Sequence, residues 1–293
     1  MMLSLLRWIS RWPLGLLHAV GAMLGWITWA LSPSYRRRLR ANADLAGVSA
    51  SARRRSVGEA GRMVAEVPWL WLKPAGETLE GLVRWDGAEL IAQAIAAGRG
   101  TLFLTPHLGS FEVSARAVAE RFGAERPLTV LYRPARKPWL REMEETSRHR
   151  PGLATAPASL AGVRQMLRAL RRGEMVGLLP DQVPPHGQGV WAPFFGQPAY
   201  TMTLAARMVQ QTGATLVLLW CERLAGGAGF VVHVRALGEA LPEASDQSEA
   251  AQTAAASIIN RAMERIILQQ ASQYLWGYNR YKKPRSPSLA TPE

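Results

Sequence analysis

Residues 101–118 read TLFLTPHLGSFEVSARAV and carry the main evidence for the class of fold. The first five residues form an apolar run typical of a short buried strand, which ends at Pro106. From Ser110 onward the apolar residues recur at helical spacing, which predicts a helix over residues 110–121. The chain therefore passes from a buried strand into a helix through a short turn, as in proteins whose parallel strands alternate with helices.

The same alternation recurs along the chain. Strands are predicted at residues 128–132, 175–179, 216–220 and 230–234, the last two joined as a hairpin. Helices are predicted at residues 41–85 (amphipathic), 88–97, 137–149, 159–172, 201–212 and 246–270. Residues 181–200, rich in Pro and Gly, are expected to form a loop. The expected fold class is therefore α/β, with a mixed, largely parallel sheet flanked by helices.

The composition narrows the possible functions. The 293 residues include 35 Lys and Arg against 22 Asp and Glu, a formal charge of +13, and 48% of them are hydrophobic. This apolar content excludes a wholly disordered or collagen-like chain. The single Cys221 offers no internal disulfide and no zinc cluster, and we expect neither a metal nor a cofactor. The basic charge suits nucleic acid or a membrane, but no nucleic-acid-binding motif accompanies it, so nucleic acid is not an expected partner.

The N-terminus predicts a membrane anchor. Residues 12–35 read WPLGLLHAVGAMLGWITWALSPSY and carry no formal charge. As a helix this stretch would be about 36 Å long, enough for a hydrocarbon core of roughly 30 Å. Residues 36–40, four of which are arginines, follow directly and resist translocation. We expect a retained anchor helix with the rest of the chain cytoplasmic. An interfacial helix, a signal peptide and a buried core helix are the alternatives.

His107 and Glu112 form an H-x-x-x-x-E pattern directly after the strand. Residues five apart on one helix lie on nearly opposite faces, but the turn at Gly109 can fold the imidazole back over the first helical turn. Glu112 would then orient His107 as a general base that accepts a proton from an attacking hydroxyl. The alternative is purely structural, with Ser110 as the helix N-cap and Glu112 as a first-turn acid.

Polar segments also follow two other predicted strands. Arg133 lies in Tyr132–Pro134, and Asp181 and Gln182 follow Pro180. Open α/β sheets bind ligands at the carboxyl ends of their strands, so we expect these segments to join His107 at a substrate-binding edge. Arg133 would bind phosphate or stabilise developing negative charge, and Asp181 would position substrate or Arg133. A surface salt bridge for Arg133 and a turn cap for Asp181 are the alternatives.

These blocks, with Pro193–Gly196 (PFFG), resemble the lipid A biosynthesis lauroyl/myristoyl acyltransferases, within the wider glycerolipid acyltransferase group that uses H-x-x-x-x-D/E. The resemblance extends from the anchor through Tyr274–Trp276 and Arg280–Lys282. It implies acyl transfer from acyl carrier protein, or from acyl-CoA, to a hydroxyl of a lipid A precursor. The reaction would take place at the inner membrane, among its lipids, with the catalytic domain facing the cytoplasm.

The chain is expected to divide into three parts. Residues 1–35 would form the membrane-anchor helix, residues 36–283 the acyltransferase domain and residues 284–293 a disordered tail. A thioester already has a good leaving group, so a base, charge stabilisation and alignment are sufficient for transfer, without a nucleophilic Cys or a G-x-S-x-G motif. Two alternatives stay open: an acyltransferase for another acceptor such as a lysophospholipid, and a catalytically silent lipid-binding protein of the same fold.

Overall fold

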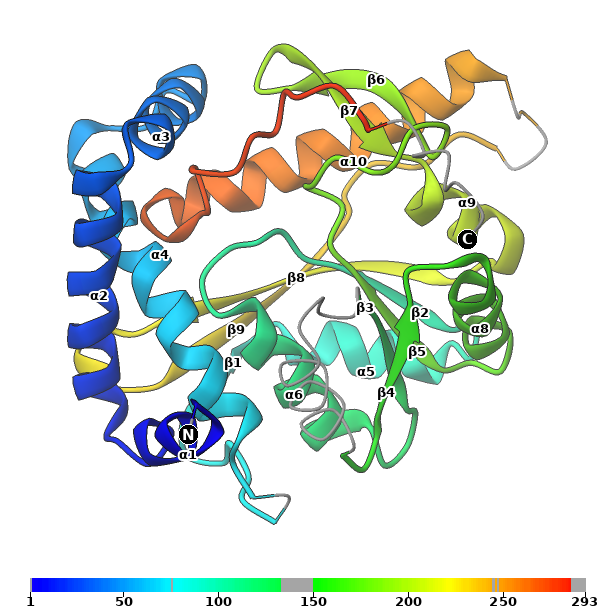
Figure 1. Ribbon diagram of the computed structural model, residues 1–293. Coiled ribbons are helices and arrows are strands. Elements are labelled where there is room, and N and C mark those ends of the chain that lie inside the picture. The colour runs from blue at the N-terminus through cyan, green and yellow to red at the C-terminus, as the bar shows by residue number, and fades with distance from the viewer. Residues whose placement is uncertain (1, 75, 133–149, 244–245, 247, 286–293) are drawn as a thin grey trace, which may run out of the picture.

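The computed structural model describes residues 2–74, 76–132, 150–243, 246 and 248–285. Seven strands form one sheet in the order β1-β9-β8-β2-β5-β3-β4 (Figure 1). Their bounds are β1 Val83–Asp86, β2 Thr101–Leu104, β3 Leu128–Tyr132, β4 Leu153–Pro157, β5 Met175–Leu178, β8 Thr215–Arg223 and β9 Phe230–Ala236. Neighbouring strands pair in parallel except β8 and β9, which are antiparallel. The predicted mixed, largely parallel α/β sheet is confirmed.

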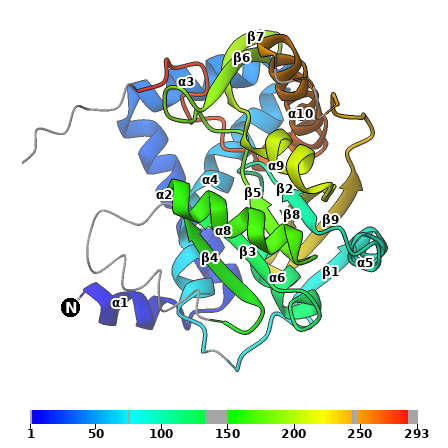
Figure 2. The same cartoon turned by 90° about the vertical axis from the view of Figure 1, so that its right-hand side faces the viewer.

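Helices cover both faces of the sheet. In chain order they are α1 Met2–Ile9, α2 Leu14–Leu31, α3 Pro33–Leu45, α4 Ala50–Trp71, α5 Ala88–Ala96, α6 Phe111–Phe122, α8 Leu160–Arg171, α9 Leu204–Thr212 and α10 Glu249–Gln269. Two short 3-10 turns are η1 Ala225–Gly227 and η2 Ala271–Gln273. Figure 2 shows α8 lying across the sheet, nearest the viewer.

Strand β2 explains why the core has two halves. Its four residues are all buried, and alternate side chains point to opposite faces of the sheet. Leu102 and Leu104 pack in one cluster with side chains of α8, α9 and α10. Phe103 packs in the other cluster with side chains of α5 and α6. A strand buried on both faces appears in the sequence as a continuous apolar run, which is what residues 101–105 contain.

The structure corrects the expected loop at residues 181–200. This region contains an antiparallel hairpin of β6 Gly189–Phe194 and β7 Gln197–Met202. Residues in β6 alternate between inward and outward positions, but Pro193 lies within the strand and weakens the strand signal. The short strand β4 was also not predicted. Strand β1 begins inside residues 41–85, which were predicted as helical, whereas helix α4 ends at Trp71. Residues 137–149, the predicted helix, lie outside the described residues.

Helix α2, the candidate membrane anchor, packs closely along α4 (Figure 1). Glycines permit this approach: a Cβ added at Gly61 of α4 would lie 2.0 Å from the carbonyl oxygen of Gly21. A Cβ added at Gly25 would lie 2.4 Å from the carbonyl oxygen of Val57. The two backbones are therefore in contact along this stretch, and a larger side chain would separate the helices.

We expect Gly61→Ala to lower the free energy of unfolding by about 1–3 kcal/mol, because the added methyl group collides with the backbone of α2. Gly58→Ala in the same helix is the matched control, since its Cβ would lie 3.4 Å from Ala22, at ordinary contact distance. Both variants gain the same helix propensity over glycine. Chemical denaturation of the detergent-solubilised protein measures the difference. Equal stability of the two variants would contradict this packing.

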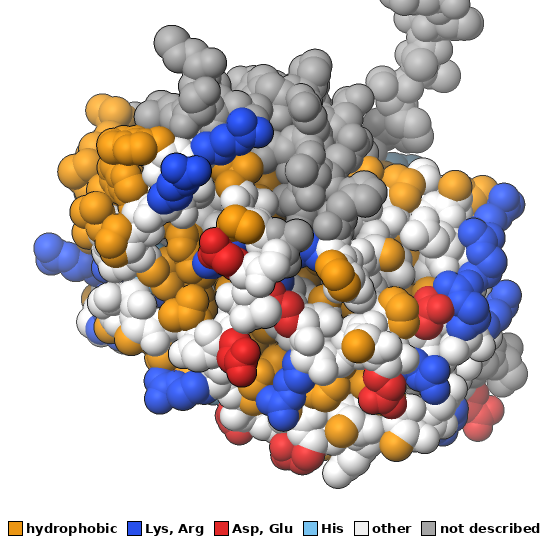
Figure 3. Space-filling model, turned by 90° about the horizontal axis from the view of Figure 1, so that it is seen from below, with side chains coloured by type: hydrophobic (Ala, Val, Ile, Leu, Met, Phe, Trp, Pro, Cys, Tyr) orange, Lys and Arg blue, Asp and Glu red, His pale blue; other side chains and the backbone are white. Residues whose placement is uncertain are grey.

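The face of α2 turned away from α4 is apolar. Leu14–Leu31 has a mean hydropathy of 1.6, and 28% of this window is buried, so by length and composition it is a candidate membrane span. The exposed large side chains of α2 include Leu16, Met23, Leu24 and Ile27. Figure 3 shows hydrophobic side chains gathered along the left of the molecule, the side on which Figure 1 places α2, with Lys and Arg beside them. Such a rimmed apolar patch is typical of a surface that contacts a membrane or another protein.

Candidate active site

The turn between β2 and α6 holds His107 at the carboxyl edge of the sheet. Gly109, with φ of 59°, lies where a Cβ would be 2.0 Å from the carbonyl oxygen of Cys221, so only glycine fits there. The backbone N–H of Gly109 donates to the carbonyl of Gln273 at 3.0 Å, and that of Ser110 to the carbonyl of Cys221 at 2.8 Å. Leu275 donates from its backbone N–H to the carbonyl of His107 at 3.2 Å. The turn is thus held by β8 and by the segment after α10.

Asp181 contacts both the side chain and the backbone of His107. Its Oδ1 lies 2.8 Å from Nδ1 of the imidazole, and its Oδ2 accepts the backbone N–H of His107 at 2.9 Å. The hydroxyl of Tyr274 donates to Oδ2 at 3.2 Å. Burial of Asp181 opposes ionisation, but the charge and hydrogen bonds of His107 prevail and lower the pKa of the carboxyl. An ionised, buried carboxylate therefore fixes the position of the imidazole.

The hydrogen bonds of the ring define its chemistry. With Nδ1–H donating to Asp181, Nε2 carries the lone pair that accepts a proton. The side-chain amide of Gln182 donates to this Nε2 at 3.0 Å. The imidazole is 18% exposed, so it remains in reach of a ligand. Gln182 occupies the position that a substrate hydroxyl would take when it donates to Nε2.

The residue that orients His107 was predicted incorrectly. Glu112 was expected to contact the ring, but the structure places Asp181 on Nδ1 and Gln182 on Nε2. Phe111 is the first-turn residue beside the imidazole, with ring centroids 4.9 Å apart. Glu112 accepts a hydrogen bond at 3.3 Å from the indole of Trp71. Because β2 and β5 are adjacent, the end of β5 reaches His107 directly; a catalytic role for Glu112 stays a prediction.

Of the other expected site residues, Asp181 and Gln182 lie in the described part of the chain and Arg133 does not. Asp181 and Gln182 follow β5 and meet His107, as the arrangement of parallel strands predicts. Arg133 follows β3, but it lies outside the described residues. Its expected role in phosphate binding or charge stabilisation therefore stays a prediction.

Comparison with known proteins identifies the chain. Residues 1–283 match the family model of the bacterial lipid A biosynthesis acyltransferases. The chain belongs to this family. It is 27% identical over 226 residues to the lipid A biosynthesis lauroyltransferase of Escherichia coli (strain K12), covering 76% of this chain and 68% of that protein. It is 25% identical over 198 residues to the palmitoleoyltransferase of the same strain, covering 67% of this chain and 60% of that protein.

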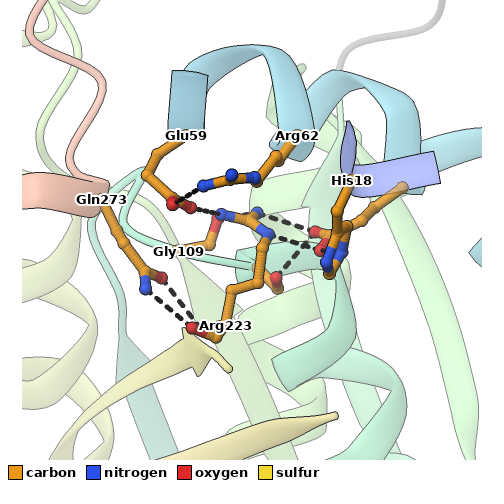
Figure 4. Close-up of polar contacts among 8 residues, drawn as sticks. His18, Glu59, Arg62, Gly109, Arg223 and Gln273 are labelled. Carbon is orange, nitrogen blue, oxygen red and sulfur yellow. Dashed lines mark hydrogen bonds and ion pairs between the residues drawn. The ribbon is translucent and has the colours of Figure 1, made fainter. Parts of the chain in front are cut away.

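In this member of the lipid A acyltransferase family, a buried ionic network holds the turn that carries His107 (Figure 4). Arg223 at the end of β8 is the centre of the network. Its guanidinium donates to Glu66 at 2.7 Å, to Glu59 at 2.8 Å and to the carbonyl of Gly109 at 3.2 Å. Ser110 donates from its hydroxyl to Glu66 at 2.7 Å. Helix α4 and strand β8 therefore hold two consecutive residues of the turn.

The network also reaches helix α2. Nε2 of His18 in α2 lies 2.6 Å from Glu66, and both side chains are buried. Gln273 completes the arrangement, since its side chain makes two hydrogen bonds to the backbone of Arg223, at 2.8 and 2.9 Å (Figure 4). One set of contacts thus connects helix α2, helix α4, strand β8 and the turn that carries His107.

Sequence reasoning assigned no role to Glu66, Arg223 or Tyr274 in the site. The sequence does indicate that Glu66 is unusual, because it is a lone acid within the apolar stretch of residues 63–72. A carboxylate buried in such a stretch needs a hydrogen-bonding or charged partner. Nothing in the sequence connects it with Arg223, which lies 157 residues further along the chain. Only the crossing of α4 over the end of β8 brings the two together.

The network makes the stability of the protein sensitive to acid. Burial opposes the ionisation of Glu66, but the charge and hydrogen bonds of Arg223 lower the pKa of this carboxyl below its ordinary value of 4.5. A lowered folded-state pKa stabilises the protein above the ordinary value, and this contribution is lost as the pH falls through the folded-state pKa. We expect the free energy of unfolding to fall below about pH 4.5, and less steeply in Glu66→Gln.

Salt distinguishes this contribution from that of surface carboxylates. Arg261 and Arg265 lower the pKa of the partly exposed Glu239 to about 2, but solvent and salt screen this cluster. Denaturation curves across the acid range should therefore keep the contribution of Glu66 in high salt and lose that of Glu239. An acid transition identical in Glu66→Gln and the parent protein would contradict the assignment.

Proposed function

We propose that this protein transfers a fatty acyl chain from an acyl thioester to a hydroxyl of a lipid A precursor at the inner membrane. The observation that carries the proposal is the His107–Asp181 pair at the carboxyl edge of the sheet, with Nε2 of the imidazole directed to a position that a hydroxyl can occupy. Membership of the lipid A acyltransferase family supports the acceptor class. Acyl carrier protein is the proposed donor, with acyl-CoA as the other thioester of this class.

In the proposed mechanism His107 is the general base. The acceptor hydroxyl displaces the amide of Gln182 and donates to Nε2, which takes the proton as the oxygen attacks the thioester carbonyl carbon. The carbon–oxygen bond forms, the carbon–sulfur bond of the tetrahedral intermediate breaks, and the imidazolium returns the proton to the departing thiolate. The carboxylate of Asp181 stabilises the imidazolium and holds its orientation through both proton transfers.

Direct transfer to the acceptor agrees with the state of Cys221. This thiol is fully buried on β8, and burial, reinforced by the nearby Glu66, raises its pKa well above the ordinary value. A buried thiol of high pKa is a poor nucleophile, since the thiolate is the reactive form. The acyl chain therefore passes from donor to acceptor without a cysteinyl intermediate. Glu112 and Arg133 are proposed to assist at this edge, Arg133 by stabilising the oxyanion.

The packing of α2 favours attachment along the bilayer surface over a full span. Helix α4 follows α2 closely and carries Arg54 and Arg62. If α2 crossed the bilayer in this arrangement, these charged side chains would enter the hydrocarbon. We propose that the exposed apolar face of α2 is immersed at the interface, with Arg37 and Arg38 beside anionic headgroups and the α/β domain on the cytoplasmic side.

An assay of the detergent-solubilised protein tests the proposal. Acyl carrier protein and coenzyme A thioesters of several chain lengths are each presented with a lipid A precursor and with a lysophospholipid, and products are identified by mass spectrometry. We expect transfer to the lipid A precursor with the carrier-protein donor preferred. Transfer to the lysophospholipid alone would contradict the proposed acceptor and indicate an acyltransferase for lysophospholipids. Binding of acceptor without transfer from any donor would indicate a silent lipid-binding protein.

A further inference from the structure

A groove of about 890 Å³ lies between helices α2, α3 and α4, on the side of the anchor helix. Its lining includes five arginines from α3 and α4, namely Arg36, Arg37, Arg40, Arg53 and Arg54. Trp26 and Trp29 of α2 line the opposite part, and Leu39 and Val57, both nearly fully buried, form its floor. The groove therefore combines aromatic and aliphatic surface with a dense group of guanidinium donors.

The positive charge in this groove greatly exceeds the negative charge beside it. Asp44 forms an ion pair with Arg53 and lies 3.5 Å from Arg40. In the part of the chain that the structure describes, Arg37 forms no ion pair. Arg36 donates to the carbonyls of Trp29 and Ala30 at 3.1 and 2.5 Å, at the end of α2. The groove therefore retains unneutralised cations that favour an anion.

The tryptophans hold two of the guanidiniums in place. The Trp26 and Trp29 rings lie edge to face, with centroids 5.5 Å apart. Arg36 lies over the Trp29 ring at 5.3 Å, and Arg54 over the Trp26 ring at 5.7 Å. A guanidinium stacked on an aromatic ring is already oriented, so less conformational freedom is lost when its N–H groups bind a ligand. Tryptophan also favours the headgroup zone of a bilayer.

Helix α3 joins this groove to the catalytic residues. Asn42 donates from its side-chain amide to the carbonyls of Trp276 and Tyr278, at 2.7 and 2.8 Å. The same C-terminal segment contacts the active site, because Tyr274 donates to Asp181 and Leu275 donates to the carbonyl of His107. A lipid whose headgroup lies in the groove would therefore contact α3, and Asn42 of α3 is hydrogen-bonded to the C-terminal segment that supports the His107–Asp181 pair.

We propose that this groove binds a phosphate group of the acceptor lipid and so presents the acceptor to His107. Guanidinium forks bind phosphate oxygens in pairs, and the aromatic and aliphatic lining suits the adjoining apolar part of an amphipathic lipid. The proposal rests on the proposed function for the identity of the acceptor. It adds a binding subsite on α3 and α4, separate from the strand ends that carry the reaction, and makes the phosphate a condition of tight binding.

The test measures equilibrium binding of a phosphorylated lipid A precursor, and of the same lipid after phosphatase treatment, to the full chain in nanodiscs of phosphatidylcholine. His107→Ala is the background, so that no acceptor is consumed. Arg37→Gln/Arg40→Gln tests the groove. Arg164→Gln/Arg168→Gln, exposed on α8, is the control that removes the same charge elsewhere. We expect the groove variant to bind the phosphorylated lipid about 10- to 100-fold more weakly, with the control and the dephosphorylated lipid unaffected.

Three results would overturn the inference. One is an equal loss in the α8 control, which would indicate diffuse surface charge. Another is an equal loss for the dephosphorylated lipid, which would show that the groove does not recognise the phosphate. The third is full competition by phosphatidylglycerol, which would identify a general contact with anionic bilayers. Binding is measured without turnover, so absence of acyl transfer would defeat the proposed function alone, whereas transfer with unchanged binding in the groove variant would defeat the inference alone.

Discussion

Replacing His107 by alanine is expected to lower the rate of acyl transfer by about 10²- to 10⁴-fold, the usual contribution of a positioned general base. In the proposed mechanism Nε2 of this imidazole takes the proton of the acceptor hydroxyl, and hydrogen bonds to Asp181 fix the orientation of the ring. Initial rates of the purified protein at saturating donor measure the loss. His186→Ala, on an exposed loop, is the matched control and should retain its rate.

Asp181→Asn separates orientation from base strength. The carboxylate accepts from both Nδ1–H and the backbone N–H of His107, whereas an amide presents one acceptor and one donor to these two groups. The ring must then move or change its tautomer. We expect a loss of about 10²-fold or more, together with an altered pH dependence of the rate and a changed ¹⁵N signature of the imidazole. Full activity of His107→Ala, or an unchanged tautomer of the imidazole in Asp181→Asn, would contradict the proposed mechanism.

Arg223→Met is expected to lower the free energy of unfolding by about 3–5 kcal/mol, the loss typical when one partner of a buried ion pair is removed. Glu66 would keep its charge in a site where its side chain is 5% exposed, and the carbonyl of Gly109 would lose a donor. The matched control is Arg261→Met, whose partner Glu239 lies at the surface; we expect a change of about 0–1 kcal/mol there. Chemical denaturation followed by tryptophan fluorescence measures both.

A double variant tests the physical cause. Glu66→Gln/Arg223→Met removes the buried charge as well as its partner, so it should recover part of the stability lost in Arg223→Met. The rate of transfer should not recover in parallel, because Ser110 and Gly109 would still lack the charged groups that hold the turn. Equal stability of the single and double variants would show that a Glu66 carboxylate deprived of Arg223 is not the source of the loss.

The network gives a physical reason for charged residues in the core. A buried ion pair is weak evidence for net stability, because desolvation of both partners opposes their attraction. Here the charged groups do something that apolar residues cannot, since they donate to and accept from the backbone and hydroxyl groups of the turn that carries His107. Arg223 binds the carbonyl of Gly109, and Glu66 accepts from Ser110. We therefore attribute to the network the placement of His107 relative to α2 and α4.

The local sequence pattern was sufficient to predict an element when its own residues form an apolar run or show helical spacing. The run before His107 predicted β2, helical spacing predicted α6, and the Leu128–Tyr132 strand has the expected bounds. It failed for the hairpin of β6 and β7, where Pro193 and two glycines suggest a loop although the strands pair over six residues each. Hairpin pairing depends on contacts with α10, which no local window contains.

By itself, the sequence determined the alternation of strands and helices, the apolar N-terminal helix, and the placement of His107, Asp181 and Gln182 after parallel strands, because periodicity and strand direction are properties of short segments. Only the tertiary structure decided which acid holds the imidazole. Glu112 is near His107 along the chain, yet Asp181 reaches the ring because β2 and β5 are neighbours in the sheet. The same holds for Glu66 and Arg223: contacts between distant segments follow from the packing of whole elements, which a linear pattern does not record.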